Sequence, residues 1–466
     1  MDLIATHTND VLKVLHHGLI VDRRITRRLK KRPLLNLARK MRAALPARLM
    51  RLLKLIGKMA EEKEFAAFVI GGFVRDLIMN VRNYDVDIVV EGNAIEFAKA
   101  FADRLKGSLV IHRKFGTATV VMPWGLGRNG RFKVDIATAR RERYEFPAAL
   151  PDVEFSSLRD DLYRRDFTIN AMAIVLNSKN FGQLIDFFNG QRHLEEGVVS
   201  VLHKESFMDD PTRIFRAVRF EQRYGFKIDK PTENLIKKAI KKDMFGRTGN
   251  MRIRDELILI LKEEDPMRAI RRMHQLDELR FIHPKIKMQE DLRSLFKSIK
   301  QTCRWYKKSQ LKERSLDDWL MYLMALFENL DKKDAKAICN KFAFRRGDTM
   351  RIASYKEEGD RVLKFMSQKK KMPPSSVYKR LRPLSYEVIL VLYAKADDRK
   401  IKSRIINFLL KSNDIKIKTT GDDLKRLGFK PGPALGKALK EILYAKIDDK
   451  IETRKDELSL AREMLK

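Results

Sequence analysis

The stretch from Phe68 to Val90 constrains the fold of this chain more than any other. It reads FVIGGFVRDLIMNVRNYDVDIVV: an apolar run, a glycine pair, a helical pattern and a second β-forming run that carries two aspartates. Asp85 and Asp87 are two residues apart in that second run, and side chains at this spacing lie on the same face of a strand. Two carboxylates on one strand are suitable oxygen ligands for Mg²⁺ that also binds nucleotide phosphates. The stretch therefore predicts metal-dependent phosphate chemistry.

Two neighbouring features support this interpretation. Gly71 and Gly72 let the backbone approach a phosphate closely, and a helix over Phe73–Met79 offers free N–H groups at its start. Asp135 lies in another β-like run, FKVDI (residues 132–136), which we interpret as a neighbouring strand that completes the site. Each feature alone has an ordinary explanation, because a DxD pair is usually a solvated strand end and a glycine pair is usually a turn. Their order along the chain is what favours a functional site.

The order of these motifs resembles the nucleotidyltransferase superfamily to which DNA polymerase β belongs, in which GGFVRD is followed by DVD. Two downstream motifs, RRDFTIN (Arg164–Asn170) and DDPTRIFRAVRF (Asp209–Phe220), are similar to those of class II tRNA nucleotidyltransferases and bacterial poly(A) polymerases. The resemblance extends from about Leu52 to Leu261 and is weaker beyond. It implies an α+β head with a polymerase β-like sheet, followed by all-α neck, body and tail domains.

The resemblance also assigns roles to particular residues. It implies catalysis by Asp85, Asp87 and Asp135, with Mg²⁺ held by Asp85 and Asp87. It implies nucleotide binding by residues of the glycine turn and the two downstream motifs: Gly71, Gly72, Arg75, Asp76, Arg164, Arg165, Asp166, Asn170, Asp210, Arg213, Arg216 and Arg219. Guanidinium groups suit phosphates, whereas carboxylates and amides suit sugar hydroxyls. An alternative is that Arg165 and Asp166 only tie the head to the neck.

The motif DDPTR differs from the family's usual EDxxR, because Asp209 stands in place of the glutamate. The resemblance implies that Asp210 and Arg213 read the incoming base. A carboxylate accepts a hydrogen bond from the exocyclic amine of adenine or cytosine, whereas uracil and guanine present a carbonyl oxygen there. Asp210 could instead cap a helix whose first residue is Pro211.

The segment between Asp135 and Arg164 corresponds to the flexible loop that permits addition of the terminal A in this family. It is full length and carries both basic and acidic residues: Arg140, Arg141, Arg143, Asp160 and Asp161. This argues against an enzyme that adds only CC. It leaves open whether the chain builds the whole CCA end or only its final A.

The charge of the chain is strongly positive. It has 98 lysines and arginines against 62 acidic residues, a net charge of +36, which predicts salt-sensitive binding to a polyanion. The acceptor and TΨC arm of tRNA is the polyanion that the resemblance implies. The two cysteines and eight histidines lack metal-ligand spacing, and no apolar run is long enough to span a membrane. These features predict a cytoplasmic protein.

The pattern along the chain predicts five parts. Residues 1–60 are a basic helical extension with 15 lysines and arginines and 3 acids, and its segment Ile4–His17 resembles the end of a CBS-type module. The catalytic head spans residues 61–203, the base-recognition neck 204–300, the body 301–368 and the basic, tRNA-binding tail 369–466. In the head we expect helices over Phe73–Met79 and Ala94–Leu105, and strands over residues 65–70, 86–90, 108–112, 117–122, 132–137, 169–176 and 183–187.

Together these patterns predict a template-independent tRNA nucleotidyltransferase that completes the 3′ CCA end, adding the terminal A from ATP by two-metal nucleotidyl transfer. A full CCA-adding enzyme that also uses CTP, or a bacterial poly(A) polymerase, would carry nearly the same motifs. A catalytically inactive RNA-binding protein is disfavoured by the three aspartates. A small-molecule nucleotidyltransferase is disfavoured by the long basic helical region that follows the head.

Overall fold

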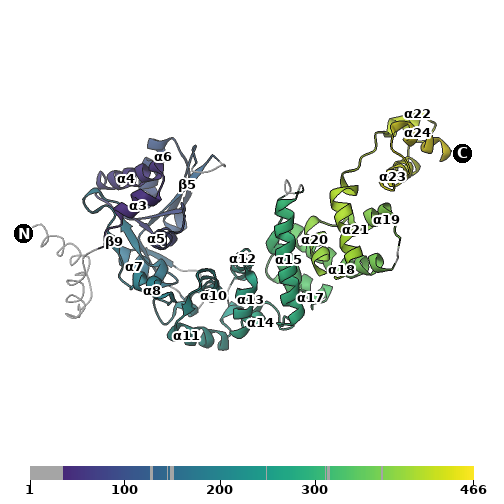
Figure 1. Ribbon diagram of the computed structural model, residues 1–466. Helices are drawn as coiled ribbons and strands as arrows, with labels where there is room; N and C mark the ends of the chain where they lie inside the picture. Colours follow the sequence, from purple (N-terminus) through teal and green to yellow (C-terminus); the bar gives the residue numbers. More distant parts are fainter. Residues whose placement is uncertain are drawn as a thin grey trace, which may run out of the picture. The chain divides into compact units, whose positions relative to one another are not determined.

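The computed structural model describes residues 35–125, 130–143, 145–146, 152–247, 249–309, 311, 315–368 and 371–465. The chain forms two compact units, Met1–Thr248 and Gly249–Lys466 (Figure 1). The boundary falls inside the predicted neck, and the finer division into five parts stays a prediction. The segment Ile4–His17, with its resemblance to a CBS-type module, lies outside the described residues.

A seven-stranded sheet forms the centre of the first unit, in the order β3-β4-β5-β2-β1-β8-β9. Its strands are β1 (Ala66–Ile70), β2 (Val86–Glu91), β3 (Ser108–His112), β4 (Thr117–Met122), β5 (Phe132–Thr138), β8 (Ala173–Val175) and β9 (Leu184–Ile185). Strands β2 and β5 run parallel, and the other neighbours are antiparallel. The parallel register places Asp87 directly opposite Asp135. The predicted α+β head is confirmed.

Helices cover this sheet where the sequence has apolar residues at helical spacing. Helix α6 (Ala94–Leu105) lies on β4 and β5 and buries Phe97 and Phe101, as the predicted helix over the same residues requires. Helix α4 (Ala47–Glu61) lies on β1, and it packs so closely that a Cβ atom on Gly57 would stand 1.8 Å from the carbonyl oxygen of Leu176. Helix α5 (Gly72–Ile78) begins in the glycine turn and matches the predicted helix to within one residue.

Two of the predicted strands are wrong in extent. The run 169–176 holds a 3₁₀ turn over Thr168–Asn170 and a strand of only three residues, because Asn170 turns its side chain into a polar network instead of continuing the ladder. The run 183–187 pairs only over Leu184–Ile185. There the carboxylate of Asp186 accepts hydrogen bonds from the backbone N–H groups of Gly190 (2.8 Å) and Gln191 (2.9 Å) and ends the strand in a turn.

The segment expected as a flexible loop forms a hairpin in its described part. Strand β6 (Arg140–Arg143) pairs antiparallel with β7 (Asp152–Phe155), and Arg141 lies opposite Glu154. Both strands are rich in charged residues, which are poor strand formers, so sequence pattern gave no strand signal there. Cross-strand ion pairs between oppositely charged side chains support the pairing, including Arg141 with Glu154 at 2.9 Å.

The first unit continues as short helices and one small sheet. The helices are α7 (Leu158–Tyr163), α8 (Gly190–Glu196), α9 (Ser206–Asp209), α10 (Thr212–Tyr224) and α11 (Lys230–Lys241), and strands β10 (Val198–Val199) and β11 (Lys227–Ile228) pair in parallel. Helix α10 carries the DDPTR motif at its start. Its residues Ile214, Phe215 and Val218 are fully buried and fix which face of the helix is left for the arginines.

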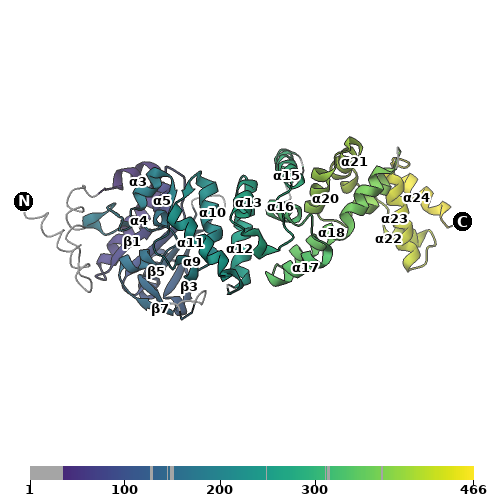
Figure 2. The same ribbon diagram turned by 90° about the horizontal axis from the view of Figure 1, so that it is seen from below.

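In the described part of the second unit, helices are the regular secondary structure, joined by loops (Figure 2). Its helices are α12 (Asn250–Leu261), α13 (Pro266–Gln275), α14 (Leu279–Ile282), α15 (Glu290–Lys308), α16 (Asp318–Leu326), α17 (Lys332–Lys341), α18 (Arg346–Ser367), α19 (Pro374–Leu381), α20 (Tyr386–Lys395), α21 (Arg399–Leu410), α22 (Gly421–Arg426), α23 (Pro433–Ile447) and α24 (Arg454–Glu463). A small apolar cluster that includes Leu424 and Ile442 holds the last three helices together. None of the helices in the described ranges is long and apolar enough to cross a lipid bilayer.

Candidate active site

Three carboxylates meet at one edge of the parallel strand pair. Asp87 is half-buried on β2, Asp135 is its partner in register on β5, and Asp85 directly precedes β2. Burial, together with the charges of Asp85 and Asp135, raises the pKa of Asp87 to about 6 against an opposing contribution from Arg165. Asp135 in turn accepts a hydrogen bond of 2.5 Å from the hydroxyl of Thr119. Much of the negative charge of this cluster is therefore uncompensated by the protein.

The donor set fits a hard divalent cation that is delivered together with a phosphate ligand. Among the described residues, no three His, Cys, Asp or Glu side chains are placed to hold a metal ion by themselves. Mg²⁺ rarely needs such a cage, because it usually binds one or two carboxylates and takes its other ligands from water and substrate phosphates. Asp85 and Asp87 are the two carboxylates that fit this pattern, and a cation there would relieve their repulsion.

The glycine turn beside the carboxylates is shaped by a backbone conformation that favours glycine. Gly71 has φ +69°, and a Cβ atom there would lie 3.1 Å from Nη1 of Arg165. The Arg165 guanidinium donates from Nη2 to Asp161 at 3.1 Å. Its buried Nε has no hydrogen-bond partner among the described atoms. Arg165 thus lies against the glycine turn, close enough to Asp87 to oppose the rise in its pKa.

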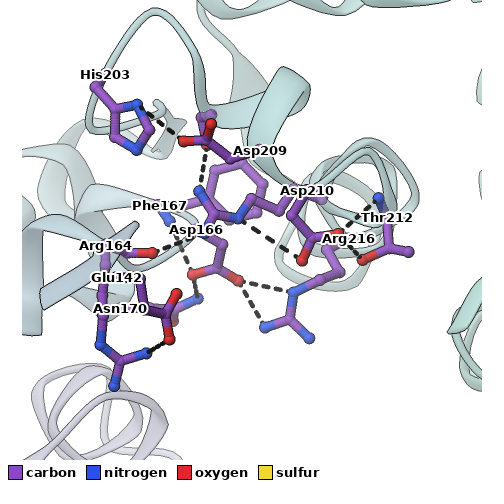
Figure 3. Close-up of polar contacts among 12 residues, drawn as sticks. Glu142, Arg164, Asp166, Phe167, Asn170, His203, Asp209, Asp210, Thr212 and Arg216 are labelled. Atoms are coloured by element: carbon purple, nitrogen blue, oxygen red, sulfur yellow. Dashed lines mark hydrogen bonds and ion pairs between the residues drawn. The ribbon is translucent and has the colours of Figure 1, made fainter. Parts of the chain in front are cut away.

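The remaining residues of the second motif form a buried network (Figure 3). Asp166 accepts from Nδ2 of Asn170 at 2.9 Å and from two nitrogens of Arg216 at 2.6 and 2.9 Å. Burial alone would raise the pKa of Asp166, but the charge of Arg216 and the hydrogen bond from Asn170 outweigh it and lower the pKa to about 2. Asn170 also accepts from Arg75 at 2.5 Å. This network joins the segment before β8, which includes the 3₁₀ turn at Thr168–Asn170, to α5 and α10.

Arg75 and Asp76 lie inside the same unit and contact α10. Arg75 is buried, donates from Nε to Asp76 at 2.8 Å, and has its guanidinium carbon 5.3 Å from the ring centroid of Phe220 and 4.9 Å from that of Tyr224. Arg219 is also buried, with its guanidinium carbon 4.9 Å from the Phe220 centroid. These contacts make Arg75 a bridge between α5 and α10, and a nucleotide contact for these three residues stays a prediction.

Asp210 and Arg213, the predicted base-reading pair, are engaged within the protein. Asp210 accepts from the backbone N–H of Thr212 at 3.1 Å and from its hydroxyl at 2.6 Å, so its carboxylate is held at the start of α10, although the N-cap residue of this helix is Pro211 (Figure 3). Arg213 donates to the hydroxyl of Ser206 at 2.8 Å and to the carbonyl oxygen of Arg164 at 2.7 Å. Nε of Arg213 lies 3.9 Å from Asp210. The two side chains are neighbours, as base reading requires, and that role stays a prediction.

Asp209, at the position of the family's glutamate, lies near His203. Their closest atoms are 3.9 Å apart (Figure 3). Burial raises the pKa of Asp209 to about 6 and lowers the pKa of His203 to about 4. Both side chains are therefore partly desolvated, and Asp209 is the last residue of α9.

Sequence reasoning did not assign roles to several residues that the fold brings to the site. Asp161 is fully buried and pairs with both Arg164 and Arg165, whereas in the sequence it is one of two adjacent acids in a charged segment. Glu142 pairs with Arg164 at 2.8 Å from the hairpin strand β6. Thr119 supports Asp135 from β4. Only the position of Asp161, three residues before a recognised motif, offered any sequence signal.

The mixed sheet, the glycine turn and the carboxylate pair in register define a nucleotidyltransferase head of the polymerase β type. Comparison with known proteins narrows this class. Residues 67–200 match the poly A polymerase head domain family. The chain is 40% identical over 421 residues to the A-adding tRNA nucleotidyltransferase of Geobacter sulfurreducens, a match that covers 90% of this chain and 47% of that protein. The chain thus spans about half the length of this relative.

Two further matches cover about nine tenths or more of both this chain and the matched protein. The A-adding tRNA nucleotidyltransferase of Halalkalibacterium halodurans is 31% identical over 89% of this chain and 92% of its own length. The solved structure of the Thermotoga maritima CCA-adding enzyme complexed with tRNA_CCA has a TM-score of 0.73 and 34% identity, covering 93% of this chain and all of that one. The chain therefore belongs to the tRNA nucleotidyltransferase and poly(A) polymerase family, and the predicted resemblance is confirmed.

Proposed function

We propose that this chain is a template-independent tRNA nucleotidyltransferase that transfers AMP from ATP to the 3′ end of a tRNA that already ends in CC. The observation that carries this proposal is the uncompensated carboxylate cluster of Asp85, Asp87 and Asp135, placed beside the Gly71 turn and Arg165. The names of the Geobacter and Halalkalibacterium relatives support A addition.

The residues of the site divide the work of binding and positioning. Arg165 and the glycine turn bind the triphosphate, because they offer a guanidinium group and a close backbone approach. The 3′-hydroxyl oxygen of the tRNA bonds to the α-phosphorus, and the bond from that phosphorus to the pyrophosphate oxygen breaks. Mg²⁺ bound at Asp85 and Asp87 would lower the pKa of the attacking hydroxyl and neutralise charge on the leaving group. Asp135, oriented by Thr119, borders the same space.

Base choice in this proposal falls to Asp210 and Arg213. Both lie at the start of α10, where Asp210 keeps a carboxylate oxygen 3.9 Å from the Arg213 guanidinium. Adenine would accept from the arginine at a ring nitrogen and donate from its amine to the carboxylate. The nucleotide would thereby replace the long contact between the two side chains.

The proposed macromolecular partner is tRNA, held at its acceptor and TΨC arm. The net charge of +36 supplies the attraction, and exposed lysines near the end of the chain, including Lys430 in the loop before α23 and Lys437 on α23, suit phosphate contacts. The Thermotoga relative in complex with tRNA_CCA supports this partner. A cytoplasmic location belongs to the same proposal, and the two buried cysteines, Cys303 and Cys339, are free thiols.

A full CCA-adding enzyme is the second candidate. It is favoured by the likeness to the Thermotoga CCA-adding enzyme over the whole of that chain. Such an enzyme would use CTP for two additions before it uses ATP. Poly(A) polymerase activity is a third outcome of the same assay, since the head matches a domain family described by that activity.

The test is 3′-end extension of three transcripts of one tRNA, which lack CCA, end in CC or are complete. Each is incubated with Mg²⁺ and one or both nucleotides, and product lengths are read on a gel. One A added only to the CC transcript is the expected result. CCA built on the bare transcript would make the chain a full CCA-adding enzyme, and long A tails on all three would replace the proposal with a poly(A) polymerase. No extension of any transcript would overturn the proposed function.

A further inference from the structure

Asp161 on α7 lies beneath both arginines of the Arg164–Arg165 pair. Its side chain is fully buried, and each of its carboxylate oxygens contacts a different arginine. Oδ1 accepts from Nη2 of Arg164 at 2.8 Å, and Oδ2 accepts from Nη2 of Arg165 at 3.1 Å. Burial would raise the pKa of Asp161, but the two guanidinium groups outweigh it and lower the pKa, so the carboxylate stays charged. One buried charge thus fixes two adjacent side chains.

The two arginines differ in how many carboxylates hold them. Arg164 donates twice to Asp161, and its Nη1 donates to Glu142 of β6 at 2.8 Å. The Glu142 side chain is itself almost fully buried and also pairs with Arg140 at 3.1 Å. The positive charge of Arg164 is therefore shared between two buried acids of the protein, and its position joins α7 to the hairpin.

Arg165, in contrast, is held by one carboxylate among the described residues, that of Asp161. Its Nη2 is bonded to Asp161, its Nη1 lies against the Gly71 turn, and its buried Nε has no hydrogen-bond partner in the described part of the chain. The Arg165 side chain is 20% exposed, and its Nη1 group is the donor that lies at the turn. Phosphate oxygens bound at the glycine turn would be suitable acceptors for this group.

We propose that Asp161 is a positioning residue for nucleotide binding, which holds the Arg165 guanidinium against the glycine turn, while Arg164 serves to anchor the hairpin and does not contact the triphosphate. This inference rests on the proposed function. An arginine side chain has several rotatable bonds, and fixing it before the ligand arrives reduces the entropy lost on binding. Asp161 also keeps Arg165 from moving onto Asp87, the negatively charged neighbour with which it already interacts.

The test measures the affinity of the full-length chain for ATP and for AMP, without tRNA, by calorimetric titration. Asp161→Asn keeps the shape of the side chain but loses the charge and one acceptor, so its amide NH₂ would oppose one of the two guanidinium groups. We expect ATP affinity to fall about tenfold, the loss of a charge-assisted hydrogen bond, and AMP affinity to change by less than about twofold. Asp160→Asn is the matched control, because Asp160 is the neighbouring acid on α7 and its carboxylate accepts hydrogen bonds from the hydroxyls of Ser156 and Ser157, not from an arginine, in the described structure.

A double-mutant cycle separates positioning from general support of the fold. If Asp161 acts through Arg165, Asp161→Asn has no further effect on ATP affinity in an Arg165→Gln background. Additive losses, or an Asp161→Asn variant that binds ATP like the parent chain, would overturn the inference. If Asp161→Asn fails to fold, or weakens ATP and AMP equally, Arg165→Gln is compared with Arg164→Gln. A much larger loss of ATP affinity for Arg165→Gln supports the inference, and equal losses overturn it.

A negative result for Asp161 can be distinguished from a failure of the proposed function. Absence of 3′ extension by the parent chain would remove the tRNA activity but leave the ATP and AMP affinities to be read on their own. Conversely, normal extension with unchanged ATP affinity in Asp161→Asn would remove only the role of Asp161.

Discussion

The first unit contains two groups of carboxylates that the fold treats in opposite ways. At the edge of β2 and β5, Asp85, Asp87 and Asp135 lie together, and the pKa of Asp87 is raised to about 6. In the second motif, Asp166 is paired with an arginine, and its pKa is lowered to about 2. Both groups belong to sequence motifs of the same family, so motif membership alone does not tell them apart.

The difference lies in what neutralises the charge. Asp166 and Asp161 are buried and receive hydrogen bonds from guanidinium groups, so their charges hold elements of the unit together. The carboxylates of the strand edge are more exposed and repel one another, which is an unfavourable arrangement that a bound cation would reverse. The comparison shows that the buried, paired acids hold arginine side chains in place, whereas the strand-edge acids keep a mutual repulsion that a bound cation would relieve.

The sharpest test of the comparison is Asp87→Ala. We expect nucleotide incorporation to fall by about a thousandfold or more, because the substitution removes a metal-binding carboxylate. Thermal stability should be unchanged or higher, since repulsion within the cluster is relieved, and tRNA affinity should be unchanged. Incorporation is read by gel extension and stability by thermal unfolding, with Asp103→Ala on the exposed face of α6 as the control. Retained incorporation would contradict the metal assignment.

Asp166→Asn should show the opposite behaviour, with its main effect on stability. Because the folded-state pKa of Asp166 is about 2 and its ordinary value is 3.8, the carboxylate stabilises the fold at neutral pH by about 2 kcal/mol. A lowered carboxyl pKa gives stability that is present above pH 4 and is lost as the pH falls from about 4 to about 2. Urea unfolding of the parent protein and of the Asp166→Asn variant across this pH range measures the difference in their free energies of unfolding. If this difference in the free energy of unfolding stays constant down to pH 2, the ion pair between Asp166 and Arg216 is not its source.

Gly71→Ala changes the contact between the glycine turn and Arg165, the residue that lies between the two groups of carboxylates. The substitution strains a backbone with φ +69° and places a Cβ atom 3.1 Å from the arginine. We expect a stability loss of about 1–2 kcal/mol from the strain and a rise of about fivefold in the KM for ATP from the displaced guanidinium. Gly225→Ala is the matched control, since Gly225 has φ +68° and open space around it. Equal KM values for the two variants would show that Arg165 is insensitive to the turn.

Thr119→Val should have the smallest effect. It removes the hydroxyl that donates to Asp135 but keeps the β-branched shape on β4. We expect kcat to fall by about threefold, near the lower limit of what a typical hydrogen bond contributes, with KM and stability little changed. Thr117→Val, two residues away on the same strand face, provides the comparison. A loss as large as that of Asp87→Ala would place Thr119 among the essential groups.

Much of the head could be predicted because its signals are local. The apolar runs of β1 and β2, the glycine turn and the helical spacing of α6 are read within a dozen residues, and the structure has these elements where they were predicted. Strand periodicity also predicts a shared face for Asp85 and Asp87, which stays a prediction because Asp85 directly precedes β2. The predicted strands at 169–176 and 183–187 were too long because buried apolar residues there lie in turns, and apolarity reports burial and not hydrogen-bond pattern.

The partners of the charged residues could not be predicted in the same way. Asp76 lies 148 residues from Tyr224, whose hydroxyl reaches it at 3.5 Å, and Arg164 lies 22 residues from Glu142. Such pairings depend on which strands and helices become neighbours. The sequence pattern of the hairpin that carries Glu142 did not predict a strand. The contact between Glu142 and Arg164 could therefore not be predicted from local sequence.

The sequence by itself determined that this chain has a nucleotidyltransferase head with a DxD strand, a glycine turn and a strongly basic helical remainder, because those properties are written in short-range pattern and composition. Only the tertiary structure decided which charges are paired. The parallel register of β2 and β5 sets Asp87 opposite Asp135, and the packing of α7 buries Asp161 beneath two arginines. The physical reason is that a charge's role depends on its burial and its neighbours, and both are set by contacts between residues distant in the chain.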